Sequence, residues 1–224
     1  MQINDDNVKK AIRVDNSVEK KQKQTLLCYN GPIGNGDKHN HIKIKIGVSG
    51  AAETGHCGLH ALDLAKELGR EVVEQGGILV TGATTGFPLW TSMGAKEAHG
   101  IVIGLSPATN AEDHVNTWHL PLEFTDLIIY TGFGFPGRDL LFTRSCDALI
   151  FGCGRIGTIH EFTIAYEDNK PIGILEGDWD TADTFRDILA RSGRSSDQII
   201  FDKDPKVLIE KILALVVENK KIVR

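Results

Sequence analysis

From Ile42 onward, short apolar runs alternate with segments of helical period. Strands alternating with helices form right-handed βαβ units, which build a parallel sheet covered on both faces. We therefore predict an α/β fold of three layers, with a mostly parallel sheet of about seven strands. The predicted strands are 42–48, 77–81, 101–105, 127–130, 148–151, 171–175 and 198–201. The predicted helices are 58–75, 89–99, 138–146, 158–169, 181–191 and 204–219.

Residues 1–40 differ from the rest of the chain. They are polar and rich in Asn, Asp, Lys and Gln, and we interpret them as an N-terminal arm. Residues 41–224 are predicted to form a single domain. The net charge of −5 argues against nucleic acid as the main partner. The sequence contains neither a run of membrane-spanning length nor a signal-peptide core, so we predict a cytoplasmic protein without a membrane partner.

The four cysteines, Cys28, Cys57, Cys146 and Cys153, show no C-x-x-C spacing. We interpret them as reduced thiols rather than as a disulfide or zinc framework. The histidines, among them His56, lack a matching spacing of acidic or cysteine partners. The sequence therefore predicts no metal site.

Two strand-end loops have similar compositions, with Gly-Ala followed by a short polar step and then Thr-Gly. Loop 49–55 follows the first predicted strand and loop 81–86 the second. Ligands of parallel sheets bind beyond the carboxyl ends of the strands, where glycine permits close approach and hydroxyls bind anions. The alternative is a pair of tight turns that cap the following helices. The candidate ligand-binding residues in these loops are Ser49, Gly50, Thr81, Gly82 and Thr85.

Loop 131–139 follows the fourth predicted strand and contains three glycines and a proline. It allows a sharp turn that brings Arg138 to the start of a helix, at the carboxyl edge of the sheet. Gly134 is a candidate binding residue in the same loop. The alternative is that Arg138 and Asp139 cap the helix and form a surface ion pair.

The glycine-rich stretch 152–161 follows the fifth predicted strand and opens a helix. Backbone N–H groups at such a helix start form a phosphate site. Glu161 lies one turn into the helix, either as a catalytic carboxylate or as the partner of Thr158 in a capping box. The stretch also matches Gly-x-Gly-x-x-Gly with Glu176 about twenty residues on, the dinucleotide-binding alternative. The predicted phosphate-binding residues are Gly154, Arg155, Ile156, Gly157 and Thr158.

These motifs taken together resemble a known family. Gly132-x-Gly134-x-x-Gly137-Arg138-Asp139, Asp147-Ala148 and Gly154-x-x-Gly157-Thr158-x-x-Glu161 resemble the Lonely Guy superfamily, often labelled "possible lysine decarboxylase". The chain is most similar to the branch that contains molybdenum-cofactor carrier proteins. The resemblance implies a Rossmann-like, nucleotide-binding domain that forms a homodimer or a higher homo-oligomer.

The resemblance also implies a reaction. The enzymes of this superfamily hydrolyse the N-glycosidic bond of nucleoside 5′-monophosphates, with a catalytic pair that corresponds to Arg138 and Glu161. The chain has Asp139 where the enzymes have lysine, and Cys153-Gly154-Arg155 where they have Pro-Gly-Gly. Binding of a phosphorylated ligand is therefore expected first. Hydrolysis, non-catalytic carriage or sensing of a phosphorylated pterin or nucleotide, and a dinucleotide-dependent enzyme are the alternatives. No cofactor is required, although a bound nucleotide or pterin fits the pattern.

Overall fold

All seven strands pair in one parallel sheet, in the order β4-β3-β2-β1-β5-β6-β7. The computed structural model describes residues 43–193 and 197–222. The strands are β1 (Lys45–Ser49), β2 (Ile78–Thr81), β3 (Val102–Ser106), β4 (Leu127–Tyr130), β5 (Ala148–Phe151), β6 (Ile172–Leu175) and β7 (Ile199–Asp202). The helices are α2 (Ala61–Glu74), α3 (Phe87–Glu97), α4 (Ala111–Asn116), α5 (Gly134–Ser145), α6 (Ile156–Glu167), α7 (Thr181–Ser192) and α8 (Pro205–Ile222).

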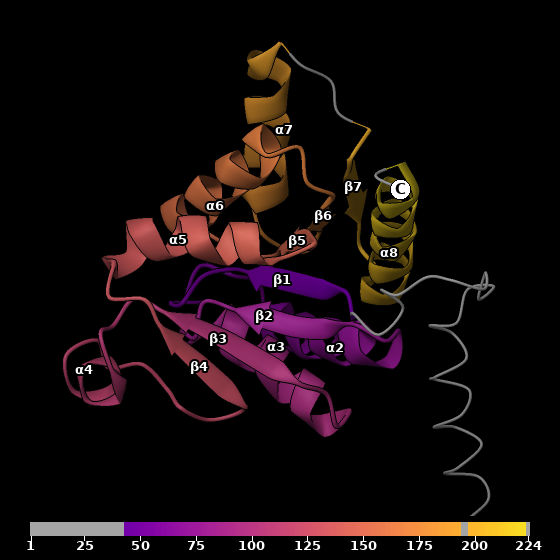
Figure 1. The fold of residues 1–224 in the computed structure, drawn as a ribbon. Helices are drawn as coiled ribbons and strands as arrows, with labels where there is room; N and C mark the ends of the chain where they lie inside the picture. The colour runs from indigo at the N-terminus through magenta and orange to yellow at the C-terminus, as the bar shows by residue number, and fades with distance from the viewer. Residues whose placement is uncertain (1–42, 194–196, 223–224) are drawn as a thin grey trace, which may run out of the picture. The chain divides into compact units, whose positions relative to one another are not determined.

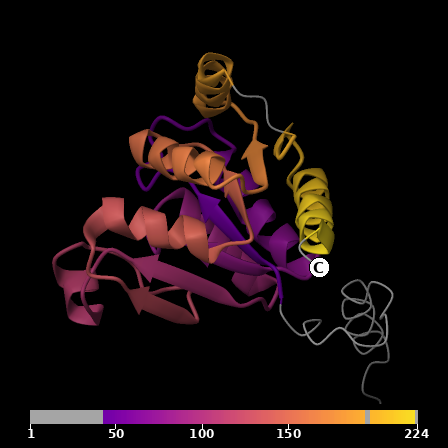
Figure 2. The same ribbon diagram turned by 45° about the horizontal axis from the view of Figure 1, so that its top comes forward.

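The sheet is wound in two directions from its centre. Strand β1 pairs with β2 on one side and with β5 on the other, so Val48 lies between Thr81 and Ile150. Right-handed crossovers toward opposite edges place their helices on opposite faces. Helices α2, α3 and α8 pack together on one face, and α5, α6 and α7 lie on the other (Figures 1 and 2).

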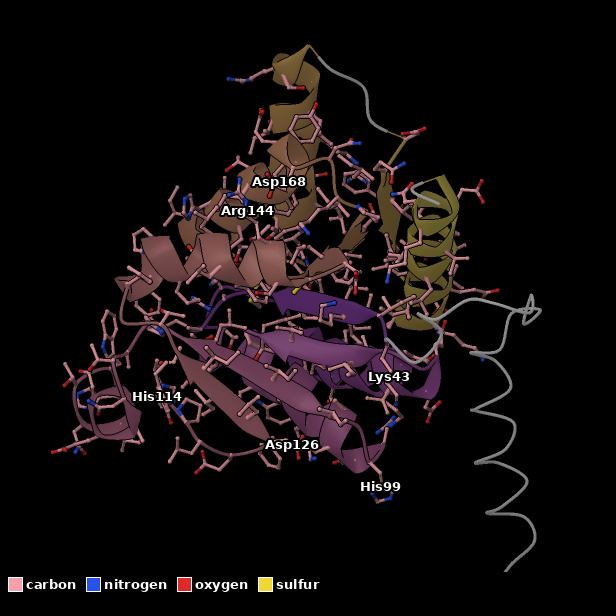
Figure 3. All side chains as sticks on the ribbon, viewed as in Figure 1. Lys43, His99, His114, Asp126, Arg144 and Asp168 are labelled. Carbon is pink, nitrogen blue, oxygen red and sulfur yellow. A yellow bond between two sulfur atoms is a disulfide. The ribbon has the colours of Figure 1, made fainter. Side chains whose placement is uncertain are left out.

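One layer of the core lies between the sheet and α5, α6 and α7, and the other lies between the sheet and α2, α3 and α8. Phe151 of β5 packs edge-on against Phe162 of α6 and Phe185 of α7, whose rings stack 4.2 Å apart. All three rings are fully buried. At the outer side of the same layer, Arg144 of α5 forms a bidentate ion pair with Asp168 at the end of α6 (Figure 3). This ion pair links the two helices that carry the site, which pack side by side.

The predicted α/β class with a parallel sheet of seven strands is confirmed, and every strand of the sheet is parallel. Most predicted helix ends shift by up to three residues, and two helices differ more from the prediction. Helix α5 begins at Gly134, four residues before the predicted start, because Pro136 is tolerated in a first turn. Helix α4 was not predicted, and Asn110 caps it by accepting from the N–H of Asp113.

Residues 43–193 and 197–222 belong to one compact unit, and the predicted arm 1–40 lies outside the described residues. Within the described ranges, no helix combines the length and apolar character needed to cross a membrane.

Helices α2 and α3 approach so closely that their contact requires glycine. A Cβ at Gly69 would overlap the carbonyl oxygen of Thr91, and a Cβ at Gly94 would overlap that of Lys66. Alanine is otherwise the better helix former by about 1 kcal/mol. We expect Gly69→Ala and Gly94→Ala each to lower the free energy of unfolding by about 1–3 kcal/mol, because overpacking outweighs helix propensity.

Urea denaturation measures this effect. The matched control is Gly157→Ala, a helical glycine whose Cβ would meet no atom within 4 Å. Its stability should equal or exceed that of the parent. Equal gains in stability at all three positions would contradict the packing argument.

Candidate functional site

A cavity of about 400 Å³ opens at the carboxyl ends of the central strands. Such clefts form where strand order reverses, here between β1 and β5. The volume falls within the range of small-molecule sites. Eight of its lining residues were predicted as site residues: Ser49, Gly50, Gly82, Arg138, Arg155, Gly157, Thr158 and Glu161.

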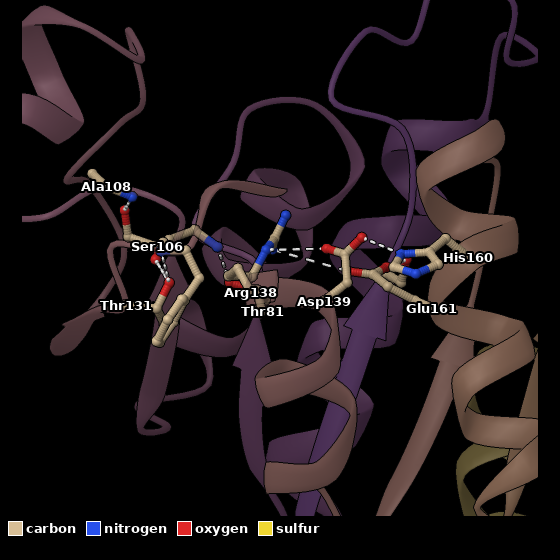
Figure 4. A network of polar contacts seen from close by, with 11 residues as sticks. Thr81, Ser106, Ala108, Thr131, Arg138, Asp139, His160 and Glu161 are labelled. Atoms are coloured by element: carbon tan, nitrogen blue, oxygen red, sulfur yellow. Dashed lines mark hydrogen bonds and ion pairs between the residues drawn. The ribbon is translucent and has the colours of Figure 1, made fainter. Parts of the chain in front are cut away.

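Arg138 lies at the base of the cavity with two carboxyl groups. The second turn of α5 presents it, and its side chain is only 6% exposed. Its Nε lies 3.2 Å from Oδ1 of Asp139, and its Nη1 lies 4.0 Å from Oε1 of Glu161 (Figure 4). Gly82 borders the guanidinium so closely that a Cβ there would overlap Nη1. The alternative of a surface ion pair between Arg138 and Asp139 is wrong, because both residues are buried.

Glu161 lies opposite, on α6, and accepts a hydrogen bond from the hydroxyl of Ser49. Burial raises the pKa of Glu161 to about 8. The charge of Arg138 and the Ser49 hydroxyl act to lower this pKa, whereas the charge of Asp139 and a hydrogen bond with it raise the pKa. Two carboxyl groups this close share one proton more readily than they both ionise. Near neutral pH, Glu161 therefore carries a proton.

His160 connects this buried cluster with the surface. Its Nδ1 lies 2.8 Å from Oδ2 of Asp139, and its side chain is 45% exposed (Figure 4). Adjacent residues on an ideal helix point about 100° apart, so sequence alone does not place His160 beside the side chain of Glu161. Asp139 interacts with both residues and so joins them in one network. Sequence spacing could not reveal this network, because it depends on how α5 packs against α6.

The start of α6 forms one wall of the cavity. Arg155 is its N-cap residue, and no side chain caps the helix. Gly157 and Thr158 in the first turn line the cavity. The capping-box interpretation is wrong, because Thr158 already lies inside the helix and Glu161 bonds to Ser49 instead. The positive end of the helix dipole thus faces a hollow, the arrangement that binds anions.

Arg155 lies at the mouth of the cavity. Its guanidinium is 3.8 Å from the carboxylate of Glu53, and both side chains are exposed, at 58% and 89%. A pair this exposed contributes little to stability. Arg155 is therefore free to exchange Glu53 for a ligand anion at small energetic cost.

Other predicted residues do not line the cavity. The N–H of Gly154 donates to Oγ1 of Thr181 at 2.9 Å, so it is not available to a phosphate. Thr85 donates to the carbonyl of Ala52, and the side chain of Ile156 is exposed. The predicted residues outside the lining set are Thr81, Thr85, Gly134, Gly154 and Ile156. Lining residues that the sequence did not single out include Ala51, Ala52, Glu53, Thr84, Pro88, Phe135 and Asp139.

Glu176, which the dinucleotide interpretation requires, has another partner. It forms an ion pair with Arg186 of α7 and is not among the residues that line the cavity. Its carboxylate is thus unavailable for the ribose contact of a dinucleotide in this cavity.

The prediction that the cysteines are reduced thiols is wrong for one pair. Cys57 and Cys153 form a disulfide across 96 residues of sequence, with their Cα atoms 5.9 Å apart. The pairing of β1 with β5 brings their following loops together, which linear spacing does not reveal. Cys146 is a free thiol in the core, where burial raises its pKa, and Cys28 lies outside the described residues.

Fold and site together define a doubly wound, Rossmann-like α/β protein with a charged cavity at its switch point. The model of the SLOG cluster4 family matches residues 43–209, and the chain belongs to this family. The resemblance to the Lonely Guy superfamily, on its molybdenum-cofactor carrier branch, is confirmed.

Solved structures agree with this placement. A molybdenum cofactor binding protein from Rippkaea orientalis matches with a TM-score of 0.65 and 29% identity, over 79% of this chain and 99% of that one. The molybdenum cofactor carrier protein of Chlamydomonas reinhardtii matches with a TM-score of 0.62 and 28% identity over the same shares. An uncharacterised protein of Archaeoglobus fulgidus is 32% identical over 133 residues, 59% of this chain and 80% of the relative.

The raised pKa of Glu161 predicts a pH-dependent difference between the parent protein and Glu161→Gln. Near pH 5 the protonated carboxyl resembles an amide, so the two should have similar free energies of unfolding. Between about pH 4.5 and pH 8 the unfolded chain releases this proton whereas the folded chain keeps it, so rising pH favours the unfolded state of the parent. The parent should therefore lose stability relative to the variant, by more than about 1 kcal/mol.

Urea unfolding at pH 5, 7 and 9 tests this expectation. Groups that titrate in both proteins cancel in the comparison. If the difference between parent and variant instead stayed constant from pH 5 to pH 9, Glu161 would be ionised in the folded chain throughout this range, and the assignment of a proton to Glu161 would be wrong.

Proposed function

We propose that this chain binds a small phosphorylated heterocycle, a pterin phosphate or a nucleoside monophosphate, and carries it without rapid turnover. The observation that carries the proposal is the pairing of the uncapped α6 N-terminus with the buried Arg138–Asp139–Glu161 cluster in one cavity. The first provides positive potential for a phosphate, and the second provides hydrogen-bonding groups for the rest of the ligand.

The protonation of Glu161 favours binding over cleavage. Hydrolysis of an N-glycosidic bond develops positive charge on the sugar, which an ionised carboxylate stabilises. A neutral carboxyl lacks that charge, but it both donates and accepts hydrogen bonds, as a heterocycle edge requires. Asp139 contributes directly to keeping Glu161 neutral. The two solved relatives named above support the carrier function, since one is a molybdenum cofactor binding protein and the other a molybdenum cofactor carrier protein.

Calorimetry tests the binding proposal. Titration with a pterin phosphate, AMP and GMP should give saturable heat for at least one of them, and none for the matching unphosphorylated compound. Arg155→Ala should weaken binding by about tenfold or more, since a charge-assisted hydrogen bond contributes about 1.5–3 kcal/mol. The matched control is Arg191→Ala, an exposed arginine in the last turn of α7. Absence of heat with every phosphorylated compound would refute the proposal.

Phosphoribohydrolase activity is the second candidate, and the proximity of Arg138 to Glu161 is the observation that favours it. If Glu161 acts as an anion, release of base from AMP should be slow at pH 7 and rise through about pH 8 as Glu161 ionises. Asp139→Asn removes the neighbouring charge, so the rise should move to lower pH. Glu161→Gln should abolish release.

The rate of base release is measured between about pH 6 and pH 9.5 for the parent, Asp139→Asn and Glu161→Gln. A rate that does not change with pH, or one that survives in Glu161→Gln, would exclude this mechanism. Binding without release at any pH would leave carriage as the function.

A further inference from the structure

A second cluster of reactive side chains lies beside the phosphate cavity. It consists of His56, Cys57 and Cys153, whose ligand atoms all lie within 4.8 Å of one another. Nε2 of His56 lies 3.6 Å from Sγ of Cys153 and 3.9 Å from Sγ of Cys57. Cys153 is fully buried, Cys57 is half-buried and His56 is exposed, so the cluster runs from the core to the surface. None of the three lines the 400 Å³ cavity.

Two thiolates and an imidazole form a soft donor set. Thiolate ligands select Zn²⁺ or Cu⁺, whereas Mg²⁺ and Ca²⁺ require oxygen ligands. Three protein ligands suit either three-coordinate Cu⁺ or tetrahedral Zn²⁺ with water in the fourth position. We propose that the reduced pair Cys57 and Cys153, together with His56, binds one thiophilic cation of this class.

The surroundings of the cluster suit a cation with an additional ligand. His56 lines a separate hollow of about 230 Å³, walled in part by Asp178 and Asp180. Trp179 lines the same hollow, and its indole Nε1 is buried without a hydrogen-bond partner among the described residues. An unpaired buried donor marks a place in this hollow where a hydrogen-bond acceptor is missing. Carboxylates beside the hollow add negative potential that favours a cation.

The disulfide is the competing state of the same sulfur atoms. A cellular dithiol reduces it by thiol–disulfide exchange, in which the dithiol becomes a disulfide and Cys57 and Cys153 become two thiols. Metal binding then displaces both thiol protons to solvent, because only thiolates ligate. Oxidation by a disulfide of the same class reverses both steps and releases the cation.

Metal retention by the purified chain tests the proposal. The protein is reduced with a water-soluble phosphine, which becomes the phosphine oxide with oxygen from water, and is exchanged into anaerobic buffer. It is then titrated with Zn²⁺, Cu⁺ or Co²⁺ against a chromophoric chelator. We expect one equivalent to be retained by the reduced chain and none by the disulfide form. Co²⁺ should show a thiolate-to-metal charge-transfer band that is absent from the oxidised protein.

Variants assign the ligands. Cys57→Ser and Cys153→Ser should lose the charge-transfer band, and His56→Ala should weaken retention by about tenfold or more, since even outer-shell losses cost about 10–100-fold. The matched control is His60→Ala, an exposed histidine that is not part of the cluster. This variant should retain the metal fully.

Two results would overturn the proposal. One is a reduced chain, folded by circular dichroism, that retains neither Zn²⁺ nor Cu⁺, which would leave the pair as a disulfide only. The other is full retention by Cys57→Ser or Cys153→Ser, which would place the metal elsewhere. Phosphate-ligand binding is measured separately, so failure of one proposal leaves the other intact.

Discussion

The parallel pairing of β1 with β5 is the constraint on which both proposed sites depend. These strands are about a hundred residues apart in sequence, and their register aligns Ser49 with Phe151. Each then continues into a loop at the same edge of the sheet. The N–H of Ala51 donates to the carbonyl of Cys153 at 2.7 Å, and that of Gly152 donates to the carbonyl of Ser49 at 3.0 Å. Two loops held this closely form the cavity on one side and the cysteine cluster on the other.

The acidic side chains at the base of the cavity outnumber the basic one, and this imbalance determines which acid keeps a proton. One guanidinium faces two carboxyl groups, all nine-tenths or more buried. Ionising both acids while they are buried from water costs free energy, and the single positive charge of Arg138 does not offset two negative charges. The state of lower free energy keeps a proton on Glu161, while Asp139 remains bound to Arg138 and to His160. A lysine in place of Asp139 would reverse this balance. The substitution that distinguishes this chain from the enzyme pattern therefore acts on the protonation of Glu161.

Much of this could be predicted from the sequence, because strand-length apolar runs and glycine-rich strand ends are local signals. The parallel sheet and the approach of Arg138 to Glu161 followed from them, since carboxyl ends of parallel strands meet at one edge. Features set by contacts between distant elements could not be predicted. The disulfide depends on the adjacency of β1 and β5, and the role of Asp139 depends on how α5 packs against α6. The start of α5 was missed because glycine and proline in a first helical turn resemble a loop.

The two hollows at this edge of the sheet differ in the chemistry that they can accept. The larger one combines a helix N-terminus with Arg138 and Arg155, which suits an anion bound through oxygen. The smaller one has sulfur and imidazole donors with aspartates on its wall, which suits a soft cation. The segment from Cys153 to Gly157 borders both hollows, because Gly154 lines the smaller one and Arg155 and Gly157 line the larger one. Cys153 is thus joined to the first turn of α6 by a short stretch of chain.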